Sequence, residues 1–208
     1  MNPSMKNRIV LAGLAALVLA VPVDLRAGKL EPYQPRPDVA ATNAAPHRPW
    51  AVKLEQPGLK NLYQVSTNLY RCAQPDERGM AVLEKLGVKT VINLRGFHGD
   101  TGEMKGTTLR GERIRFNTWH AEDEDVVKFL QIVTSTNGAP YVVHCLHGSD
   151  RTGTMIAIYR IAVEGWTKDE AIAEMTQGGF GFHAIWKNLP RYLRALDVDD
   201  LKKRAGIK

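Results

Sequence analysis

The chain has 208 residues, of which 28 are basic and 22 acidic, giving a formal net charge of +6. Two cysteines exclude a disulfide-rich scaffold. The mild positive charge suits anionic substrates, but it lacks the concentrated basic patch of a nucleic-acid binder, so no nucleic-acid partner is expected.

The first residues have the pattern of an export signal. Lys6 and Arg8 precede an uncharged apolar run over residues 9–23, which is short for a membrane span. Cleavage after Ala20 would make residues 1–20 a signal peptide, and the alternative is an uncleaved signal anchor to about residue 23. Either reading predicts a periplasmic or otherwise exported protein that contacts the membrane only through this segment.

Residues 21–58 are rich in proline and alanine and predict an extended linker. Residues 59–208 are then expected to form one folded domain, because a chain of this length can bury a single sizeable core.

Strands and helices alternate in this domain. Strands are predicted over residues 68–71, 88–94 and 113–117, and in the apolar run before Cys145. Helices are predicted from the cap Asp76 to Gly87, over 123–136, from Thr154 to Glu164, after the capping box of Thr167 and Glu170, and over 189–205. This alternation indicates a three-layer α/β fold, with a central, mostly parallel sheet flanked by helices and an active loop at the carboxyl end of a strand.

The run from His144 to Gly153 is the most informative part of the chain. It reads His-Cys-Leu-His-Gly-Ser-Asp-Arg-Thr-Gly and connects a predicted strand to a predicted helix. A helix N-terminus offers unpaired amides and about half a positive charge, which favours a bound anion such as phosphate. The same field favours the thiolate of Cys145, a nucleophile that can attack phosphorus and form a phosphocysteine. The guanidinium of Arg151 matches two phosphate oxygens.

Other residues of this run are expected to support the chemistry. Gly148 leaves the backbone free to curl around the anion, Thr152 can hydrogen-bond the sulfur, and His144 is expected to support the loop from behind. A buried core cysteine and a rhodanese-like sulfur carrier are the alternatives, and both fit this spacing less well. Phosphate is expected to bind at Leu146, His147, Gly148, Ser149, Asp150 and Arg151.

The motif His-Cys-x5-Arg-Thr-Gly resembles the signature of cysteine-dependent protein tyrosine phosphatases, in their bacterial branch similar to dual-specificity phosphatases. Residues 69–75, 91–95 and 178–183 resemble further segments of that branch, and the resemblance covers about residues 50–197. It implies a protein tyrosine phosphatase-like fold. It also implies hydrolysis of phosphate monoesters, on a phosphorylated protein or a small phosphoester, without a metal or cofactor.

Two places offer a general acid for the leaving oxygen. Most relatives use an aspartate on a separate loop, and the equivalent stretch here is residues 118–125. Asp123 is the first candidate in this stretch, followed by His120. The acidic residues of this stretch also have a structural explanation, because they favour the positive end of a helix dipole.

Asp150 is the second candidate acid. Its loop resembles the Asp-Arg-Thr loops of myotubularins and of a mycobacterial tyrosine and lipid phosphatase, in which this aspartate is thought to act in catalysis. A bound phosphate dianion would favour the protonated form of such a carboxyl group. The alternative is a loop-stiffening partner for Arg151.

Phosphoinositide-directed relatives often carry lysines inside this loop, whereas this chain has none there. The resemblance therefore favours phosphotyrosine or a generic monoester over a phosphoinositide. An inositol phosphate or phosphoinositide substrate remains an alternative, as does a non-catalytic relative that only binds phosphorylated ligands. Residues 96–111, with five glycines, indicate a mobile loop at one wall of the site. Basic residues that could gather around a polyanion, or simply be solvated, are Arg95, Lys105, Arg110, Arg113 and Arg115.

Cys72 stands where relatives usually have serine. In an oxidising compartment it could form an inactivating disulfide with Cys145, and the alternative is a passive small residue. Phe180, Phe182 and Trp186 are expected to pack in the core. His183 has no assigned role.

Overall fold

Residues 48–208 are described by the computed structural model, and they are built on a mixed sheet of six strands. The predicted signal peptide and the linker up to residue 47 lie outside the described residues. The strands are β1 (Val52–Lys53), β2 (Tyr63–Ser66), β3 (Leu69–Cys72), β4 (Thr90–Asn93), β5 (Arg110–Arg113) and β6 (Tyr141–His144).

The strand order across the sheet is β1-β2-β3-β6-β4-β5. The pairs β1–β2 and β2–β3 are antiparallel, whereas β3, β6, β4 and β5 run parallel. His144, at the end of β6, pairs with Cys72 on one side and Asn93 on the other. The carboxyl ends of three strands therefore meet at one edge of the sheet, the usual place for a ligand site in such folds.

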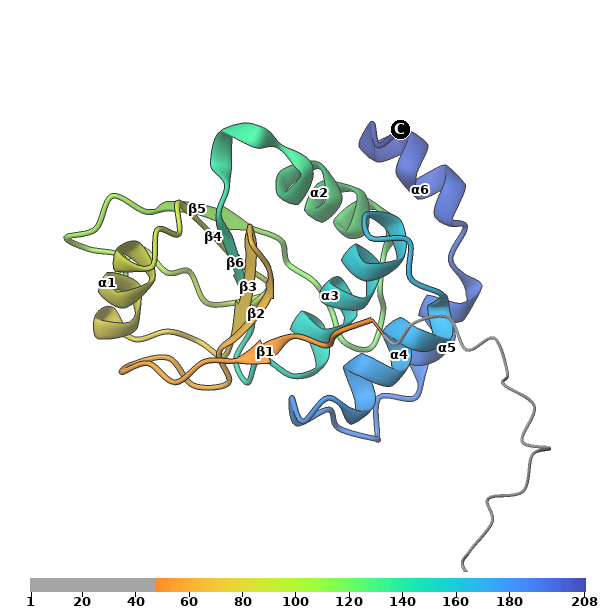
Figure 1. Ribbon diagram of the computed structural model, residues 1–208, viewed down its shortest axis with the longest axis horizontal. Helices are drawn as coiled ribbons and strands as arrows, with labels where there is room; N and C mark the ends of the chain where they lie inside the picture. Colours follow the sequence, from red (N-terminus) through yellow and green to blue (C-terminus); the bar gives the residue numbers. More distant parts are fainter. Residues whose placement is uncertain (1–47) are drawn as a thin grey trace, which may run out of the picture. The chain divides into compact units, whose positions relative to one another are not determined.

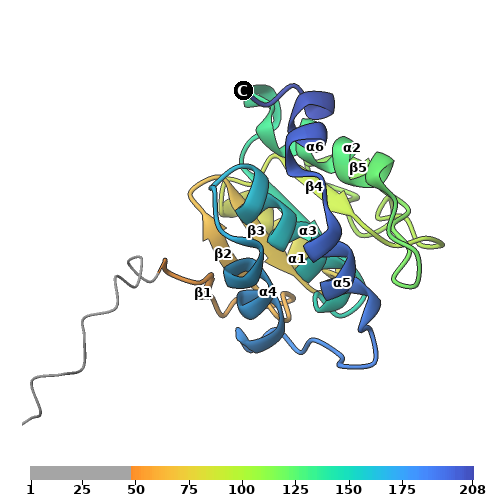
Figure 2. The same cartoon turned by 90° about the vertical axis from the view of Figure 1, so that its right-hand side faces the viewer.

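Helices cover both faces of the sheet, which gives three layers (Figures 1 and 2). One face carries α1 (Glu77–Lys85). The other carries α2 (Asp123–Thr134), α3 (Asp150–Ala162), α4 (Lys168–Gln177), α5 (Asn188–Ala195) and α6 (Val198–Ala205). A short 3₁₀ turn, Thr136–Gly138, precedes β6. The predicted α/β fold is confirmed.

The alternating side chains of the central strands build two apolar cores. Ile92 and Val143 belong to the large core with α2 to α6. Val91 and Val142 belong to the smaller core with Met80 and other residues of α1. Because both faces are covered, β4 and β6 are buried at every position, which explains why each has two adjacent apolar residues at its centre, one for each core.

Local sequence signals are confirmed at several helix ends. Oδ1 of Asp76 accepts a hydrogen bond from the backbone N of Gly79 at 2.7 Å and caps α1. Thr167 and Glu170 form the predicted capping box of α4. Gly165 follows α3 with a φ of +67°, a conformation that glycine adopts without strain.

Two predicted elements differ from the structure. The strand expected over residues 113–117 lies earlier in the structure, over residues 110–113, as β5. Its pairing with β4 ends where the backbone N of Ile114 donates to the carbonyl oxygen of Asn93. The helix expected over residues 189–205 is interrupted, because Leu196 is extended and Asp197 caps a new helix through the backbone N of Asp200.

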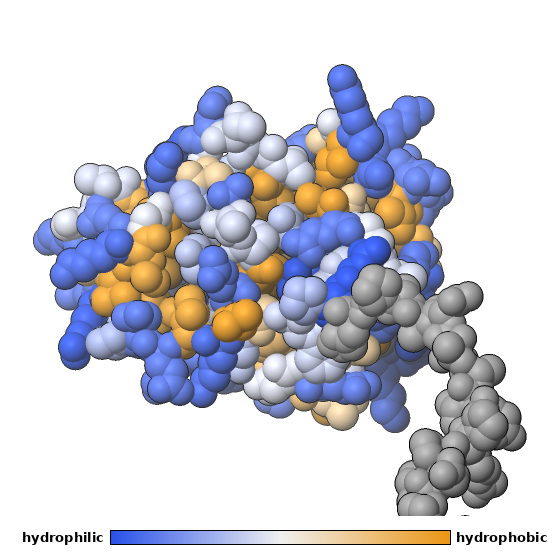
Figure 3. Space-filling model, in the orientation of Figure 1, coloured by the Kyte–Doolittle hydropathy of each residue, from blue (hydrophilic) through white to orange (hydrophobic). Residues whose placement is uncertain are grey.

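Residues 48–58, expected at the end of the linker, contribute to the domain. They contain β1, and Ala51 N donates to Glu174 Oε1 at 2.7 Å. Among residues 48–208 no helix is long and apolar enough to cross a membrane. Figure 3 shows apolar atoms reaching the surface near α1, where Leu54, Val82 and Leu86 are only partly buried.

Candidate active site

The predicted active loop runs from Cys145 to Arg151, between the end of β6 and the first turn of α3. Cys145 is 3 % exposed. Gly148 has a φ of +70°, and a Cβ there would lie 2.5 Å from the carbonyl oxygen of Cys72. Both the backbone conformation and this contact favour glycine, so the loop can lie tightly against the end of β3.

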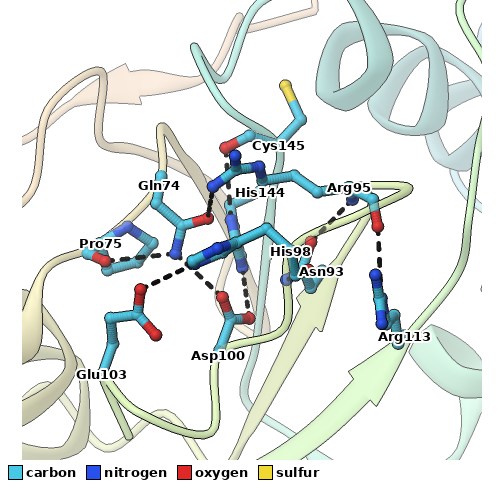
Figure 4. Close-up of polar contacts among 10 residues, drawn as sticks. All are labelled: Gln74, Pro75, Asn93, Arg95, His98, Asp100, Glu103, Arg113, His144 and Cys145. Atoms are coloured by element: carbon cyan, nitrogen blue, oxygen red, sulfur yellow. Dashed lines mark hydrogen bonds and ion pairs between the residues drawn. The ribbon is translucent and has the colours of Figure 1, made fainter.

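A chain of polar contacts supports this loop from behind (Figure 4). The ring of His144 is buried, with Nε2 lying 2.9 Å from Oδ2 of Asp100 and Nδ1 lying 3.3 Å from the carbonyl oxygen of Cys145. Oδ1 of Asp100 accepts a hydrogen bond from Gln74 Nε2 at 2.9 Å, and Gln74 Oε1 accepts one from Arg95 at 3.0 Å. The support expected from His144 thus takes the form of a buried His–Asp pair.

The Asp100 carboxylate is stabilised by these contacts. Burial raises the pKa of Asp100, but the hydrogen bond and charge of His144, with hydrogen bonds from Gln74 and Asn93, lower the pKa below its usual value of 3.8. Asp100 belongs to residues 96–111, the segment predicted as a mobile wall of the site. Its buried side chain anchors that segment to the residue that precedes Cys145.

Arg71 of β3 is a fully buried cation that contacts the loop. Its Nη2 donates to the carbonyl oxygen of Gly148 at 2.6 Å, and its guanidinium carbon lies 3.8 Å from the ring centroid of Phe180. Burial lowers the pKa of Arg71 to about 10, although the charges of Glu174 and Cys145 raise it. The side chain is therefore cationic at neutral pH, and its charge favours an anion in the loop.

Residues 178–183 pack against the other side of the loop. The carbonyl oxygen of Phe180 accepts hydrogen bonds from Ser149 Oγ at 2.8 Å and from Asn61 Nδ2 at 3.0 Å. Asn61 Nδ2 also donates to the carbonyl oxygen of His147 at 2.9 Å. The side chain of Ser149, expected to bind phosphate, is thus directed toward this neighbouring segment.

Asp150 is the first residue of α3 and is 9 % exposed. Its Oδ1 accepts a hydrogen bond from the backbone N of His183, and its Oδ2 lies 2.8 Å from Nδ1 of the same residue. Arg151 Nη1 contacts the carbonyl oxygen of Leu94 at 3.4 Å. The partner of Asp150 is therefore His183, and the alternative in which Asp150 stiffens the loop as a partner of Arg151 is not supported by these contacts.

The alternative acid, Asp123, begins α2 and faces α5. Its Oδ1 accepts a hydrogen bond from the hydroxyl of Tyr192 at 2.7 Å. Burial raises the pKa of Tyr192, and the hydrogen bond to Asp123 raises it further. His120 is exposed, with Nε2 lying 3.8 Å from a carboxylate oxygen of Glu122. Asp123, Glu124 and Asp125 occupy the first turn of α2, as the helix-dipole explanation predicts.

The basic residues of positions 95–115 do not form one patch. Arg113 Nη2 donates to the carbonyl oxygen of Gly96, so Arg113 lies close to Arg95 at the carboxyl ends of the strands. Arg110 lies at the opposite end of β5 and lines a separate cleft with Lys128. Lys105 and Arg115 are exposed.

Cys72 and Cys145 are both free thiols. Cys72 is wholly buried, and burial, followed by the charges of Cys145 and Asp100, raises the pKa of its thiol. A thiol of this kind is a poor nucleophile, because only the thiolate reacts readily. The geometry favours the passive role over the disulfide.

His98, Asp100 and Glu103 offer three potential metal-ligand atoms within 4.8 Å of one another. His98 Nε2 lies 2.7 Å from Glu103 Oε1, and both oxygens of Asp100 already accept hydrogen bonds from protein donors.

A cleft of about 620 Å³ opens beside the loop from Cys145 to Arg151, which we call the phosphate loop. Its lining includes Leu146 and His147 of the loop and, opposite them, Leu59, Lys60, Asn61 and Gln74.

The sequence matches the family described as "DSP-PTPase phosphatase fused to NAD+ Kinase" over residues 51–188. The dual specificity protein phosphatase TpbA of Pseudomonas aeruginosa is 35% identical over 164 residues, which cover 78% of this chain and 74% of that protein. The crystal structure of P. aeruginosa TpbA has a TM-score of 0.68 and 33% identity, covering 78% of this chain and 98% of that one. The core catalytic domain of SIW14 from S. cerevisiae, 21% identical, shares the fold with a TM-score of 0.61 over 71% of this chain and 92% of that one.

The fold and the cysteine loop define a cysteine-dependent phosphatase of the protein tyrosine phosphatase superfamily. Within that superfamily the chain belongs to the DSP-PTPase family, and it is a protein tyrosine or dual-specificity phosphatase. The expected family and enzyme class are confirmed.

Three residues that support the loop had no predicted role: Arg71, Asp100 and His183. Arg71 lies in residues 69–75 and His183 in residues 178–183, two segments that resemble the family. Arg71 could also have been singled out because an arginine within a short buried strand is unusual. Asp100 lies in a glycine-rich segment, where no local pattern separates it from a solvated acid.

Proposed function

We propose that this phosphatase is exported and hydrolyses phosphate monoesters of the phosphotyrosine type through a phosphocysteine intermediate. The observation that carries the proposal is the loop of Cys145, folded by Gly148 and joined to the start of α3. The amides of this loop and the side chain of Arg151 would hold the phosphate, and Arg71 adds a buried positive charge nearby.

The reaction has two steps. The thiolate of Cys145 attacks phosphorus, and the bond to the leaving oxygen breaks as that oxygen takes a proton from Asp150. Water then attacks the phosphocysteine, the S–P bond breaks as the sulfur leaves, and the water proton passes to Asp150. The buried hydroxyl of Thr152 has no hydrogen-bond partner among the described residues, and it would be free to donate to the departing sulfur.

Asp150 is preferred as the proton donor because it belongs to the phosphate loop itself, whereas Asp123 hydrogen-bonds Tyr192 of α5. A bound phosphate dianion would favour the protonated form of Asp150. A carboxyl oxygen has two hydrogen-bonding positions, so it can carry the transferable proton at one position while it keeps its contact with His183 at the other.

A phosphotyrosine substrate is preferred over an inositol phosphate. One solved structure of TpbA is a complex with phosphotyrosine, and that protein is 32% identical to this chain. The separation of Arg110 from Arg95 and Arg113 leaves fewer cations for a polyanion. The cleft beside Leu146 and His147 would take the tyrosine ring and its neighbouring residues.

Hydrolysis of p-nitrophenyl phosphate tests the activity. The wild-type chain should release p-nitrophenol in the presence of a chelator, and vanadate should block the release. Cys145→Ser should abolish turnover, because the hydroxyl is a far weaker nucleophile than a thiolate. Full turnover by Cys145→Ser would contradict the mechanism, and retained binding of phosphotyrosine without turnover by the wild type would favour the non-catalytic alternative.

Export rests on the sequence of residues 1–20 and is tested in cells. The phosphatase should fractionate with periplasmic proteins at a mass reduced by cleavage after Ala20. An uncleaved, membrane-bound product would support the signal-anchor alternative, and a cytoplasmic product would contradict export.

A further inference from the structure

The side chain of His183 lies in the segment of residues 178–183 and contacts Asp150 of the phosphate loop. Its backbone N and its Nδ1 both contact the carboxylate of Asp150, each at 2.8 Å. Asp150 is nearly buried, with a side chain 12% exposed, whereas the side chain of His183 is 53% exposed. The pair therefore connects a nearly buried carboxyl group of the phosphate loop to an imidazole whose side chain is half exposed.

We infer that His183 is a positioning residue which, together with Asp150, forms a proton-transfer couple for ester hydrolysis. The inference rests on the proposed function and deepens it, because it identifies how Asp150 gains and returns its proton. Both carboxylate oxygens of Asp150 contact His183, so a proton that leaves Asp150 can be replaced directly from the adjacent imidazole. An imidazolium can supply the missing proton, because histidine titrates in the physiological range.

The couple balances protons over the two steps. In the first, the Cys145 sulfur bonds to phosphorus and the electrons of the P–O bond pass to the leaving oxygen. That oxygen takes a proton from Asp150, which receives the Nδ1 proton of the His183 imidazolium. In the second, water bonds to phosphorus, the S–P electrons return to sulfur, and the water proton passes through Asp150 back to Nδ1. Nε2 keeps its proton in both steps, so the imidazole alternates between its imidazolium and neutral forms.

Other charged or titratable groups adjoin the couple on each side. The ring of His147 in the phosphate loop meets the ring of His183 edge-on, with centroids 5.9 Å apart. Arg151 follows Asp150 in α3. Arg71 of β3 contacts Gly148 and the ring of Phe180, between the loop and the segment that carries His183. The couple therefore lies beside two arginines and one further histidine of the described residues.

The test compares His183→Asn with the wild type. The amide Nδ2 of asparagine can replace the Nδ1 donor to Asp150, but it cannot carry a transferable proton. For phosphotyrosine, whose leaving group needs protonation, kcat/KM at pH 7 should fall by roughly 100-fold, the scale of general acid catalysis. For p-nitrophenyl phosphate, whose leaving group is a weak base, kcat/KM should fall much less. The decline of kcat/KM with rising pH should begin at a lower pH in the variant, because the variant has no imidazolium to return a proton to Asp150.

Two controls separate proton transfer from structure. His98→Asn changes another partly exposed histidine, which contacts Glu103, and it should leave the ratio of the two substrates and the pH profile unchanged. Vanadate should inhibit His183→Asn as it inhibits the wild type, because the phosphate loop is intact. Equal losses for both substrates, or an unshifted pH profile, would overturn the role of His183 while leaving the proposed function in place. Failure of the wild type to turn over either substrate would overturn both.

Discussion

Side chains from outside the phosphate loop hold its backbone in place. Asp100 hydrogen-bonds His144 behind Cys145, Arg71 donates to the carbonyl oxygen of Gly148, and His183 contacts Asp150 at the start of α3. Each contact involves a charged or buried group, so its loss leaves a desolvated partner unsatisfied. The precision of the site therefore depends on residues that do not touch the substrate.

Asp100→Asn should destabilise the domain in a pH-dependent way. An asparagine presents one oxygen and one NH₂ group, so it cannot accept from both His144 and Gln74, and the free energy of unfolding at pH 7 should fall by about 1.5–3 kcal/mol. The pKa of Asp100 is lowered in the folded state, so its stabilising effect is present above the unfolded pKa and is lost as pH falls through the folded pKa. The difference in the free energy of unfolding between the wild type and the variant should therefore become smaller below about pH 4.

Urea unfolding at a series of pH values from 7 downward measures this difference. Comparing the two proteins at each pH cancels the titration of the other carboxyl groups. A difference that stays constant down to the lowest pH would show that the ionised form of Asp100 contributes nothing.

At the scale of the elements, α3 connects the active loop to the helical layer. The guanidinium of Arg160 in α3 contacts both oxygens of Glu174 in α4 at 2.7–2.8 Å, and both side chains are almost fully buried. Burial lowers the pKa of Arg160, but the hydrogen bonds and charge of Glu174 raise it above its usual value. The pair thus fixes α4 against the helix whose first turn carries Asp150 and Arg151.

Glu174→Gln should strongly destabilise the fold. The substitution removes the buried carboxylate partner of Arg160 and leaves only the partly exposed Glu164, whose Oε2 lies 2.7 Å from Nη1. Breaking a buried ion pair costs about 3–5 kcal/mol. Chemical denaturation measures the loss. The exposed pair Arg194–Asp169, at 3.4 Å, provides the matched control, and Asp169→Asn should unfold at nearly the wild-type denaturant concentration. Equal effects of the two substitutions would contradict the importance of the buried pair.

At the scale of the whole molecule, the question is where the folded domain begins. A chain that starts at residue 48 should unfold like the full chain and hydrolyse p-nitrophenyl phosphate at the same rate. A chain that starts at residue 59 lacks β1, the packing of Trp50 and the hydrogen bond from Ala51 to Glu174, so its thermal midpoint should fall by several degrees. Identical midpoints for the two truncated chains would place residues 48–58 outside the domain.

Much of the fold could be predicted from the sequence because its signals are local. The caps at Asp76 and Thr167 mark helix starts, and the apolar run before Cys145 marks a buried strand. The ends of β5 could not be predicted this way, because its exposed residues join the sheet through backbone pairing with β4. The break at Leu196 was likewise missed, since the apolar pattern continues across it.

The sequence by itself indicated the chemistry of this phosphatase, because a cysteine, an arginine and the glycine between them lie within one short loop and are kept close together by the spacing of the chain. Tertiary structure alone decided the partners of that loop. Asp100 and His183 are 44 and 33 residues from the side chains they contact, and contacts over such distances form only when the strands and helices pack. For the same physical reason Asp123, a plausible acid in the sequence, faces Tyr192, whereas Asp150 connects the loop to His183.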